Sequence, residues 1–258
     1  MQEFSTNGYC PVCEGPRDFY ATSDKEIPEN LFPQWFRGAL RCTICRSPPR
    51  ERAISHCLNK TRPNWRSLTI HECSPGGWAF SAKLRKECPG YVATQYDPRF
   101  PFGDLQASGK WRNENLEAQT FENDRFDIVI TQDVFEHLFH PARAAREIAR
   151  TLKPGGLCLM TVPVVRFYGV TERRASLTDA GVVHHLPEQY HGNPVSDGRS
   201  LVTVDWSYDI GAYLSAASGI PFVVMLIDDM SMAIRDPHNV IVSGRKAPLP
   251  DLGEGIFG

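Results

Sequence analysis

The sequence predicts an α/β protein in which a doubly wound, mostly parallel sheet with helices on both faces follows a small cysteine-rich module. From residue 67 onward, short apolar runs alternate with helical patterns, which is typical of strand–helix–strand units. The run FDIVIT at 126–131 is almost continuously apolar, as expected for a parallel strand that is buried on both faces. Two Cys-x-x-Cys pairs set the N-terminal segment apart.

The composition is that of an ordinary globular protein, with 258 residues of which 41% are hydrophobic and 22% charged. These values exclude a wholly disordered chain, a collagen-like repeat and a disulfide miniprotein. The formal net charge of -2 gives no global basic field for nucleic acid. No signal pattern opens the chain, and the longest apolar run, 222–227, is too short to span a bilayer. We therefore expect a cytoplasmic protein without a membrane partner.

Turn residues divide the chain after residue 66 into its elements. SPGG at 74–77 ends the first strand, PG at 89–90 stops the first helix, and KPGG at 153–156 stops the second. We expect strands at 67–72, 91–96, 126–131, 157–162, 222–227 and 239–243, and helices at 80–88, 141–152 and 205–217.

The domain organisation follows from where this alternation begins and where it is interrupted. We expect a zinc-binding module at 1–66 and the sheet domain at 67–246. A polar, histidine-containing stretch at 164–204 is too long for a plain connection, so we interpret it as an inserted acceptor loop or lid. The Pro/Gly-rich tail at 247–258 is expected to fray.

Cys10, Cys13, Cys42 and Cys45 form a C-x2-C…x28…C-x2-C array. A gap of two residues lets both thiolates of one knuckle reach the same tetrahedral ion, and two knuckles supply its four ligands. A reducing compartment favours a metal over disulfides, and four thiolates leave no open position for catalysis. The array therefore predicts a structural Zn²⁺ in a zinc ribbon with a long insertion. Buried or redox-active cysteines are the alternative.

The first predicted strand meets a turn that lacks the glycine pattern of dinucleotide enzymes and the lysine of a phosphate-binding loop. A ligand without a pyrophosphate needs neither feature. S-adenosylmethionine is such a ligand. An acidic residue at the strand end suits its ammonium group, and small residues in the turn let the backbone approach closely.

One stretch carries a resemblance to a known family: FDIVITQDVFEHLFHPARAAREIARTLKPGGLCLMTVP at 126–163. Residues 67–163 resemble the class I S-adenosylmethionine-dependent methyltransferases, in particular the small-molecule branch called type 11. The stretch is similar to the fourth strand, the following helix and the fifth strand of that family, with the Glu136-His137 pair and the LKPGG turn in place. The resemblance implies a Rossmann-like sheet and S-adenosylmethionine as methyl donor.

The resemblance also implies a set of donor-binding positions, which are Glu72, Ser74, Gly76, Gln95, Asn115, Leu116, Gln132 and Asp133. Ser74 stands where the family's first motif has glycine. Gln95 and Asn115 are amides where the family uses carboxylates for the ribose and the adenine, and Asp97 is the rival of Gln95. An amide can still hydrogen-bond a diol, although without charge assistance.

Histidines are the candidate catalytic residues, because an oxygen or nitrogen acceptor must lose a proton and histidine has a suitable pKa for a general base. His137 follows the fourth strand of the family pattern, and His191 lies in the inserted loop. Each of the two is a candidate for the base. The alternative for His137 is that it only holds the loop in place. The loop also carries candidate acceptor-binding residues, which are His184, His185, Glu188 and Tyr190. Asp205 and Trp206, with Tyr208 and Asp209, are further candidates for a pocket wall, and the alternative for Trp206 is a place in the core.

Three functions from different classes fit these features. The first is a methyltransferase for a small molecule, possible acceptors being sugars or polysaccharide precursors by analogy with the family. The second is an RNA methyltransferase whose module, with a net charge of +3, uses arginines to grip RNA; the overall acidity counts against it. The third is a non-catalytic zinc-ribbon interaction protein.

Overall fold

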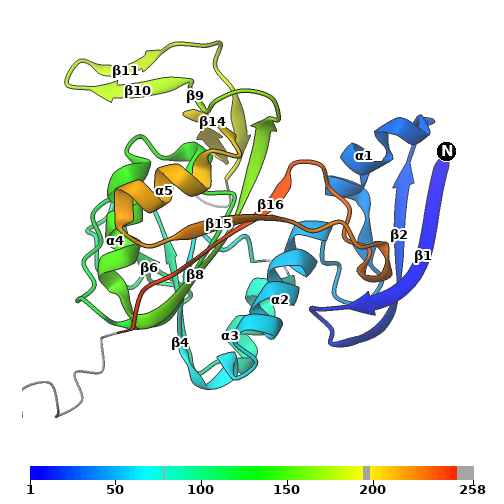
Figure 1. The fold of residues 1–258 in the computed structure, drawn as a ribbon, viewed down its shortest axis with the longest axis horizontal. Helices are drawn as coiled ribbons and strands as arrows, with labels where there is room; N and C mark the ends of the chain where they lie inside the picture. The colour runs from blue at the N-terminus through cyan, green and yellow to red at the C-terminus, as the bar shows by residue number, and fades with distance from the viewer. Residues whose placement is uncertain (78, 194–197, 249–258) are drawn as a thin grey trace, which may run out of the picture.

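The computed structural model describes residues 1–77, 79–193 and 198–248 (Figure 1). Most of the predicted tail, 249–258, therefore lies outside the described residues. Within the described ranges, no helix has both the length and the apolar character needed to cross a membrane.

The centre of the molecule is a sheet with the strand order β15-β16-β8-β7-β4-β5-β6. Its strands are β4 (Thr69–Cys73), β5 (Gly90–Gln95), β6 (Arg112–Asn113), β7 (Phe126–Gln132), β8 (Leu152–Arg166), β15 (Phe222–Leu226) and β16 (Asn239–Arg245). Only β16 runs antiparallel to its neighbours on this path; all other pairs are parallel. The order reverses between β4 and β7, the point where such sheets bind ligands. The predicted fold class is thus confirmed.

Helices cover both faces of this sheet (Figure 1). They are α3 (Ala79–Glu87), α4 (Pro141–Thr151) and α5 (Ile210–Ser218), with 3-10 turns η2 (Trp65–Ser67), η3 (Phe135–His137) and η4 (Met230–Met232). Along β7, Val129 packs with α4 and α5, whereas Ile128 and Ile130 pack with α3 on the other face. This alternation explains why the central residues of β7, 128–130, are all apolar.

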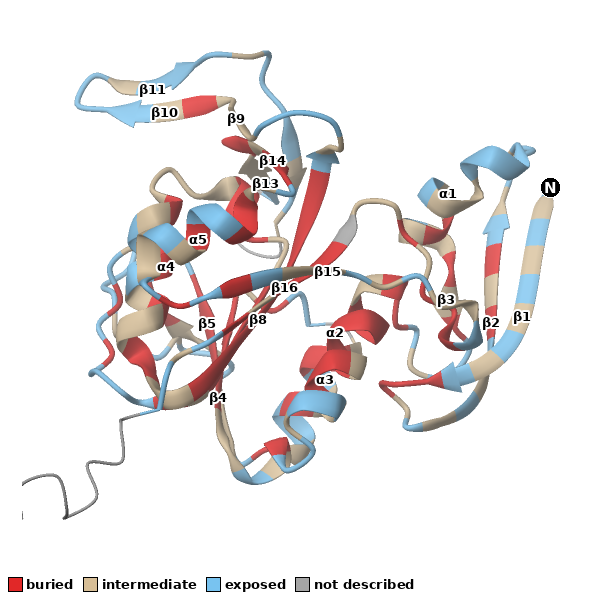
Figure 2. Cartoon of the chain, viewed as in Figure 1, coloured by how far each residue is buried: buried red, intermediate tan, exposed pale blue. Residues whose placement is uncertain are grey.

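The N-terminal module supplies the remaining cover of the second face. It consists of β1 (Gln2–Cys10), β2 (Gly15–Ser23), η1 (Glu29–Leu31), α1 (Phe32–Ala39), β3 (Arg41–Cys42) and α2 (Pro49–Thr61). Ile54 and Leu58 of α2 belong to the same buried cluster as Leu159 of β8 and Ile241 of β16. Figure 2 shows buried residues along α2 and along the central strands β4 and β8. The boundary at residue 66 stays a prediction, and the hydrophobic packing is continuous across it.

The inserted stretch is more regular than its polar sequence indicated. It forms β9 (Glu172–Arg173), the hairpin β10 (Ala175–Thr178) with β11 (Gly181–His184), and the hairpin β12 (Tyr190–Gly192) with β13 (Arg199–Leu201). The helix expected at 205–217 was wrong at its start, because β14 (Val204–Ser207) pairs with β8 and β9 and α5 begins only at Ile210. The buried side chains of Val204 and Trp206 alternate with the half-buried Asp205, which is a strand pattern.

A buried arginine joins the module to the loop between β15 and β16. The Arg52 guanidinium, fully buried on α2, donates to the carbonyl oxygens of Ser47, Leu40, Met232 and Ala233. Burial lowers the pKa of Arg52 to about 10, so the group remains charged at neutral pH. One side chain thus satisfies carbonyl groups from three parts of the chain.

Replacing this arginine tests the joint. We expect Arg52→Met to lower the free energy of unfolding by about 3 kcal/mol or more, because several buried carbonyls lose their donor. Urea denaturation followed by circular dichroism measures the change. Lys60→Met, on the exposed side of the same helix, is the control and should stay within about 0.5 kcal/mol of the parent. Equal stability of the two variants would contradict the role given to Arg52.

Candidate active site at the carboxyl edge of the sheet

Four strands end together at one edge of the sheet. Cys73 of β4 lies beside Thr94 of β5 and Thr131 of β7, so the following residues Ser74, Gln95 and Gln132 share this edge. β6 joins at Asn113, which pairs with Gln95. The structure thus brings three of the predicted donor-binding positions, Ser74, Gln95 and Gln132, to one edge of the sheet.

Glu72 is fully buried and its carboxylate is engaged by the protein itself. Oε1 accepts hydrogen bonds from Ser81 Oγ (2.8 Å) and Gln132 Nε2 (2.9 Å), and Oε2 accepts one from Tyr91 OH (2.6 Å). Burial raises the pKa of Glu72 above its ordinary value. These contacts tie β4 to α3, β5 and β7, and the predicted role of Glu72 in donor binding stays a prediction.

The turn after β4 is held in an uncommon backbone conformation. Ser74 has a φ of 52°, in the left-handed region that favours glycine. Its amide donates to Thr94 O at 2.7 Å, and Gln95 Nε2 donates to Pro75 O at 2.9 Å. Gly76 is exposed in the same turn. The Ser74 departure from the family motif is therefore accommodated at a cost in backbone strain.

The remaining predicted donor residues lie on either side of this turn. Asn115 is half-buried and accepts from the amide of Glu117 (2.9 Å), while Leu116 is buried. Asp133, with a φ of 51°, accepts from Thr161 Oγ1 at 3.0 Å. Both oxygens of Asp97, the rival of Gln95, accept from the Arg99 guanidinium.

Asp133 also connects the edge to the N-terminal module. Its Oδ2 lies 3.3 Å from Arg37 Nη2 and 3.4 Å from Arg50 Nε. Arg37 additionally donates to Asp236 Oδ2 at 2.7 Å. Two arginines of the module thus converge on the residue that follows β7.

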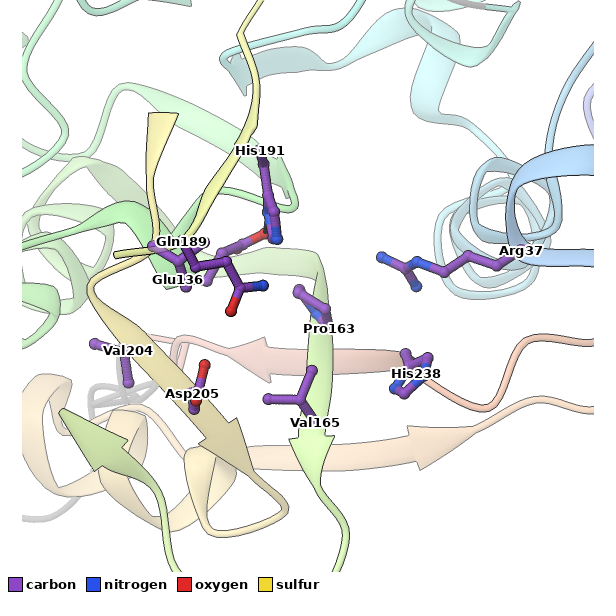
Figure 3. A pocket seen from close by; sticks show the side chains of 10 residues that line it. Arg37, Glu136, Pro163, Val165, Gln189, His191, Val204, Asp205 and His238 are labelled. Carbon is purple, nitrogen blue, oxygen red and sulfur yellow. Dashed lines mark ion pairs between the residues drawn. The ribbon is translucent and has the colours of Figure 1, made fainter. Parts of the chain in front are cut away.

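A cavity opens beside this point, between the module and the inserted segment (Figure 3). Its lining is polar on several sides and comprises Arg37, Glu136, Pro163, Val165, Gln189, His191, Val202, Val204, Asp205 and His238. Arg37 extends into it from α1, opposite His191. Asp205 and His191 were predicted as candidates from the sequence, whereas Arg37, Gln189 and His238 were not assigned to this cavity.

Both candidate catalytic histidines meet at Glu136. His137 Nε2 and His191 Nδ1 each lie 3.6 Å from Glu136 Oε1, and the two imidazole rings are 5.1 Å apart, nearly perpendicular. His137 Nδ1 donates to Leu201 O at 2.9 Å, which leaves Nε2 directed toward Glu136. The adjacent Thr203 donates through its amide to Glu136 O at 2.7 Å. The inserted segment is therefore fixed against the Glu136–His137 pair.

The other four candidates of the inserted segment do not line this cavity. His184, His185, Glu188 and Tyr190 are exposed on the hairpins or between them. His184 Nε2 lies 3.5 Å from Glu188 Oε1, Tyr190 OH donates to Glu188 Oε2 at 2.7 Å, and His185 pairs with Ser176 Oγ at 2.9 Å. Their role in acceptor binding stays a prediction.

The cysteine quartet forms a compact group in the N-terminal module. Cys10 Sγ lies 3.7 Å from Cys45 Sγ, and Cys13 Sγ lies 3.9 Å from Cys42 Sγ. Sulfur atoms about 3.8 Å apart are expected for a tetrahedron with Zn–S bonds of about 2.3 Å. Hydrogen bonds from Cys10 and Cys45 hold the pKa of Cys42 far below its usual value. These residues could hold a tetrahedral metal.

Comparison with known proteins supports the methyltransferase resemblance. Residues 73–160 match a family model described as a methyltransferase domain. The chain is 27% identical over 177 residues to an uncharacterized methyltransferase of Mycobacterium sp. (strain JLS), a match over 61% of this chain and 66% of that protein. A relative from Mycolicibacterium vanbaalenii is 27% identical over 171 residues, covering 58% and 64%. The chain thus spans slightly less than two thirds of the length of these relatives.

The fold is similar to that of a solved methyltransferase structure. The crystal structure of an S-adenosylmethionine-dependent methyltransferase from Mesorhizobium loti aligns with a TM-score of 0.50 and 15% identity, over 75% of this chain and 98% of that one. This likeness shows the fold of class I methyltransferases. Together with the family match, it confirms the resemblance drawn from residues 126–163.

The strained turn gives a prediction for stability. We expect Ser74→Gly to raise the free energy of unfolding by about 0.5–1 kcal/mol, because glycine adopts the left-handed conformation without a Cβ clash. Thermal unfolding by calorimetry measures the gain. Ser74→Ala keeps the Cβ and should bring none. A loss of stability in the glycine variant would show that Ser74 has an interaction which outweighs its strain.

Proposed function

We propose that this chain, which carries a class I S-adenosylmethionine-dependent methyltransferase domain, transfers a methyl group to a small molecule bound in the cavity beside Glu136. The observation that carries the proposal is the position of this cavity relative to the donor edge. Gln132 ends β7 at that edge, and Glu136 lines the cavity four residues later. Donor and acceptor would meet above the carboxyl end of β7.

The donor half of the site serves mainly to align the reactants. When bound, S-adenosylmethionine supplies a methyl carbon on a sulfonium; an acceptor lone pair attacks this carbon in line while the carbon–sulfur bond breaks. The turn with Ser74 and Gly76 approaches the ligand with its backbone. Gln95 and Asn115 offer amide groups to the ribose and the adenine, and Leu116 offers an apolar surface.

The acceptor half removes a proton. A histidine nitrogen of His137 or His191 takes the proton that the acceptor oxygen or nitrogen loses as it is methylated. The Glu136 carboxylate, 3.6 Å from both rings, stabilises the resulting imidazolium and orients the rings. Arg37, Gln189 and Asp205 provide hydrogen-bonding groups around the acceptor, which suits a hydroxyl-rich molecule such as a sugar.

Three arginines of the module support a small molecule over RNA. Arg37 and Arg50 pair with Asp133, and Arg52 is fully buried. These side chains are engaged within the protein, whereas a nucleic-acid grip needs basic groups on an open face.

We further propose that Cys10, Cys13, Cys42 and Cys45 hold a structural Zn²⁺. The support is the spacing of the sulfur atoms and the chemistry of four thiolates, which fill a tetrahedron. Such an ion would fasten the β1–β2 turn to the β3 knuckle. It would thereby fix the part of the module from which Arg37 reaches the cavity.

Donor binding is the direct test of the proposed function. We expect titration calorimetry with S-adenosylhomocysteine to show binding of the folded, zinc-loaded chain at micromolar concentration. Gly76→Val should abolish the heat, because the added side chain blocks the approach of the turn. Gly38→Val, in open space on α1, is the matched control and should bind as the parent does. No heat from the parent chain would refute the proposed activity.

Removal of the metal tests the zinc proposal. We expect native mass spectrometry to find one Zn²⁺ fewer per chain in Cys42→Ser than in the parent, together with a lower melting temperature. Cys57→Ala removes a buried cysteine outside the quartet and should keep the parent's zinc content. An unchanged zinc content in Cys42→Ser, or a parent without zinc, would contradict the assignment.

A further inference from the structure

We infer that Glu136, His137 and His191 form a second metal site, which binds a divalent transition-metal ion in the acceptor cavity. One carboxylate oxygen and two imidazole nitrogens lie within 4.8 Å of one another. The two nitrogens are each 3.6 Å from Glu136 Oε1, which is long for a hydrogen bond. Ligands on a common ion with bonds of about 2.1 Å are about 3.0–3.4 Å apart, so a small contraction would complete the site.

The state of Glu136 is an independent observation that points to a cation. Glu136 is only 1% exposed, and neither of its carboxylate oxygens has a hydrogen-bond partner among the described residues. A buried carboxylate normally accepts several hydrogen bonds or pairs closely with a charge, because an uncompensated buried charge is costly. A bound metal ion would supply the missing charge and the missing partner.

The orientation of His137 is that of a metal ligand. Its Nδ1 donates to the carbonyl oxygen of Leu201 at 2.9 Å, so the neutral ring presents the lone pair of Nε2 toward Glu136. Metal-bound histidines commonly hold their other nitrogen in this way. His191 lies on β12, which pairs with β13, and Thr203, two residues after β13, donates its amide to Glu136 O. The hairpin is thus anchored beside the carboxylate.

The site has room for an acceptor on the metal. Three protein ligands leave at least one coordination position open, as in catalytic zinc sites and in other sites with two histidines and one carboxylate. The adjoining cavity, about 130 Å³, far exceeds the roughly 10–15 Å³ that one water needs. The open position therefore faces a space that can hold waters or a hydroxyl group.

This arrangement narrows the acceptor class, a step that rests on the proposed function. A hydroxyl oxygen bound to the ion would lose its proton to solvent at a lower pH than when free, and the resulting alkoxide would attack the methyl carbon. With the metal bound, His137 and His191 are ligands and neither acts as the base. Coordination of the hydroxyl to the ion then promotes its deprotonation instead. The acceptor is then an alcohol or phenol whose reacting oxygen binds the metal.

Metal titration of the full, zinc-loaded chain tests the inference. Mn²⁺ is the probe, because it prefers oxygen and nitrogen ligands over the thiolates of the cysteine quartet. The electron paramagnetic resonance signal of free Mn²⁺ should fall by the amount that one bound ion per chain removes. The melting temperature should rise as Mn²⁺ is added. Glu136→Gln and His191→Ala should each weaken binding at least tenfold. His185→Ala, on the same inserted segment but bonded to Ser176, should bind as the parent does.

The outcomes separate the metal site from the proposed function. If the parent binds neither Mn²⁺ nor Zn²⁺ beyond the quartet, or if Glu136→Gln binds as tightly as the parent, the metal site is overturned. Methyl transfer that survives such a result would leave the histidine base in place. Glu136→Gln should fold without metal at least as well as the parent, because it removes a buried carboxylate that accepts no hydrogen bond. Metal binding without donor binding would refute only the proposed activity.

Discussion

The segment from Asp133 to His137 is fixed from three directions, and both halves of the site depend on it. Thr161 of β8 and two arginines of the N-terminal module hold Asp133. The inserted segment holds the other end through Thr203 and the Leu201 carbonyl. Because the segment continues directly from β7, any shift in it would move the cavity relative to the donor edge. Its conformation is therefore determined by tertiary contacts more than by its own sequence.

The N-terminal module has the role of a structural layer. In a doubly wound sheet both faces must be covered, and α2 covers part of one face beside α3. The Glu51 carboxylate of α2 accepts from the Phe80 amide at the start of α3, and burial raises the pKa of Glu51 to about 7. A metal that orders the cysteine knuckles would thus act on the sheet through shared packing. Because the module packs against the sheet, it can contribute Arg37 to a cavity whose other lining residues lie at 136–238.

The sequence was sufficient for features that local chemistry dictates, and insufficient for those set by tertiary contact. The apolar run of β7 and the turn residues around it predicted a buried parallel strand. The family resemblance supplied Gln95 and Gln132, which the structure places at one edge of the sheet on either side of β4. The hairpins at 175–201 escaped prediction, because their exposed strands carry polar residues and bury few apolar ones. Arg37 and His238 reach the cavity from distant parts of the chain, and no spacing in the sequence connects them with Glu136.

The two halves of the site differ in charge, and this difference has a consequence for catalysis. At the donor edge, amides stand at Gln95 and Asn115 where the family uses carboxylates, and Glu72 is enclosed by protein donors. The cavity proposed for the acceptor is instead lined by Glu136, Asp205, Arg37 and His191, and His137 lies 3.6 Å from Glu136. Charge assistance strengthens a hydrogen bond about twofold, so a donor held by amides binds without that gain. Charge that stabilises the transition state accelerates transfer, whereas charge that binds both states equally does not. Under the proposed function, this distribution of charge would favour activation of the acceptor over tight retention of the donor.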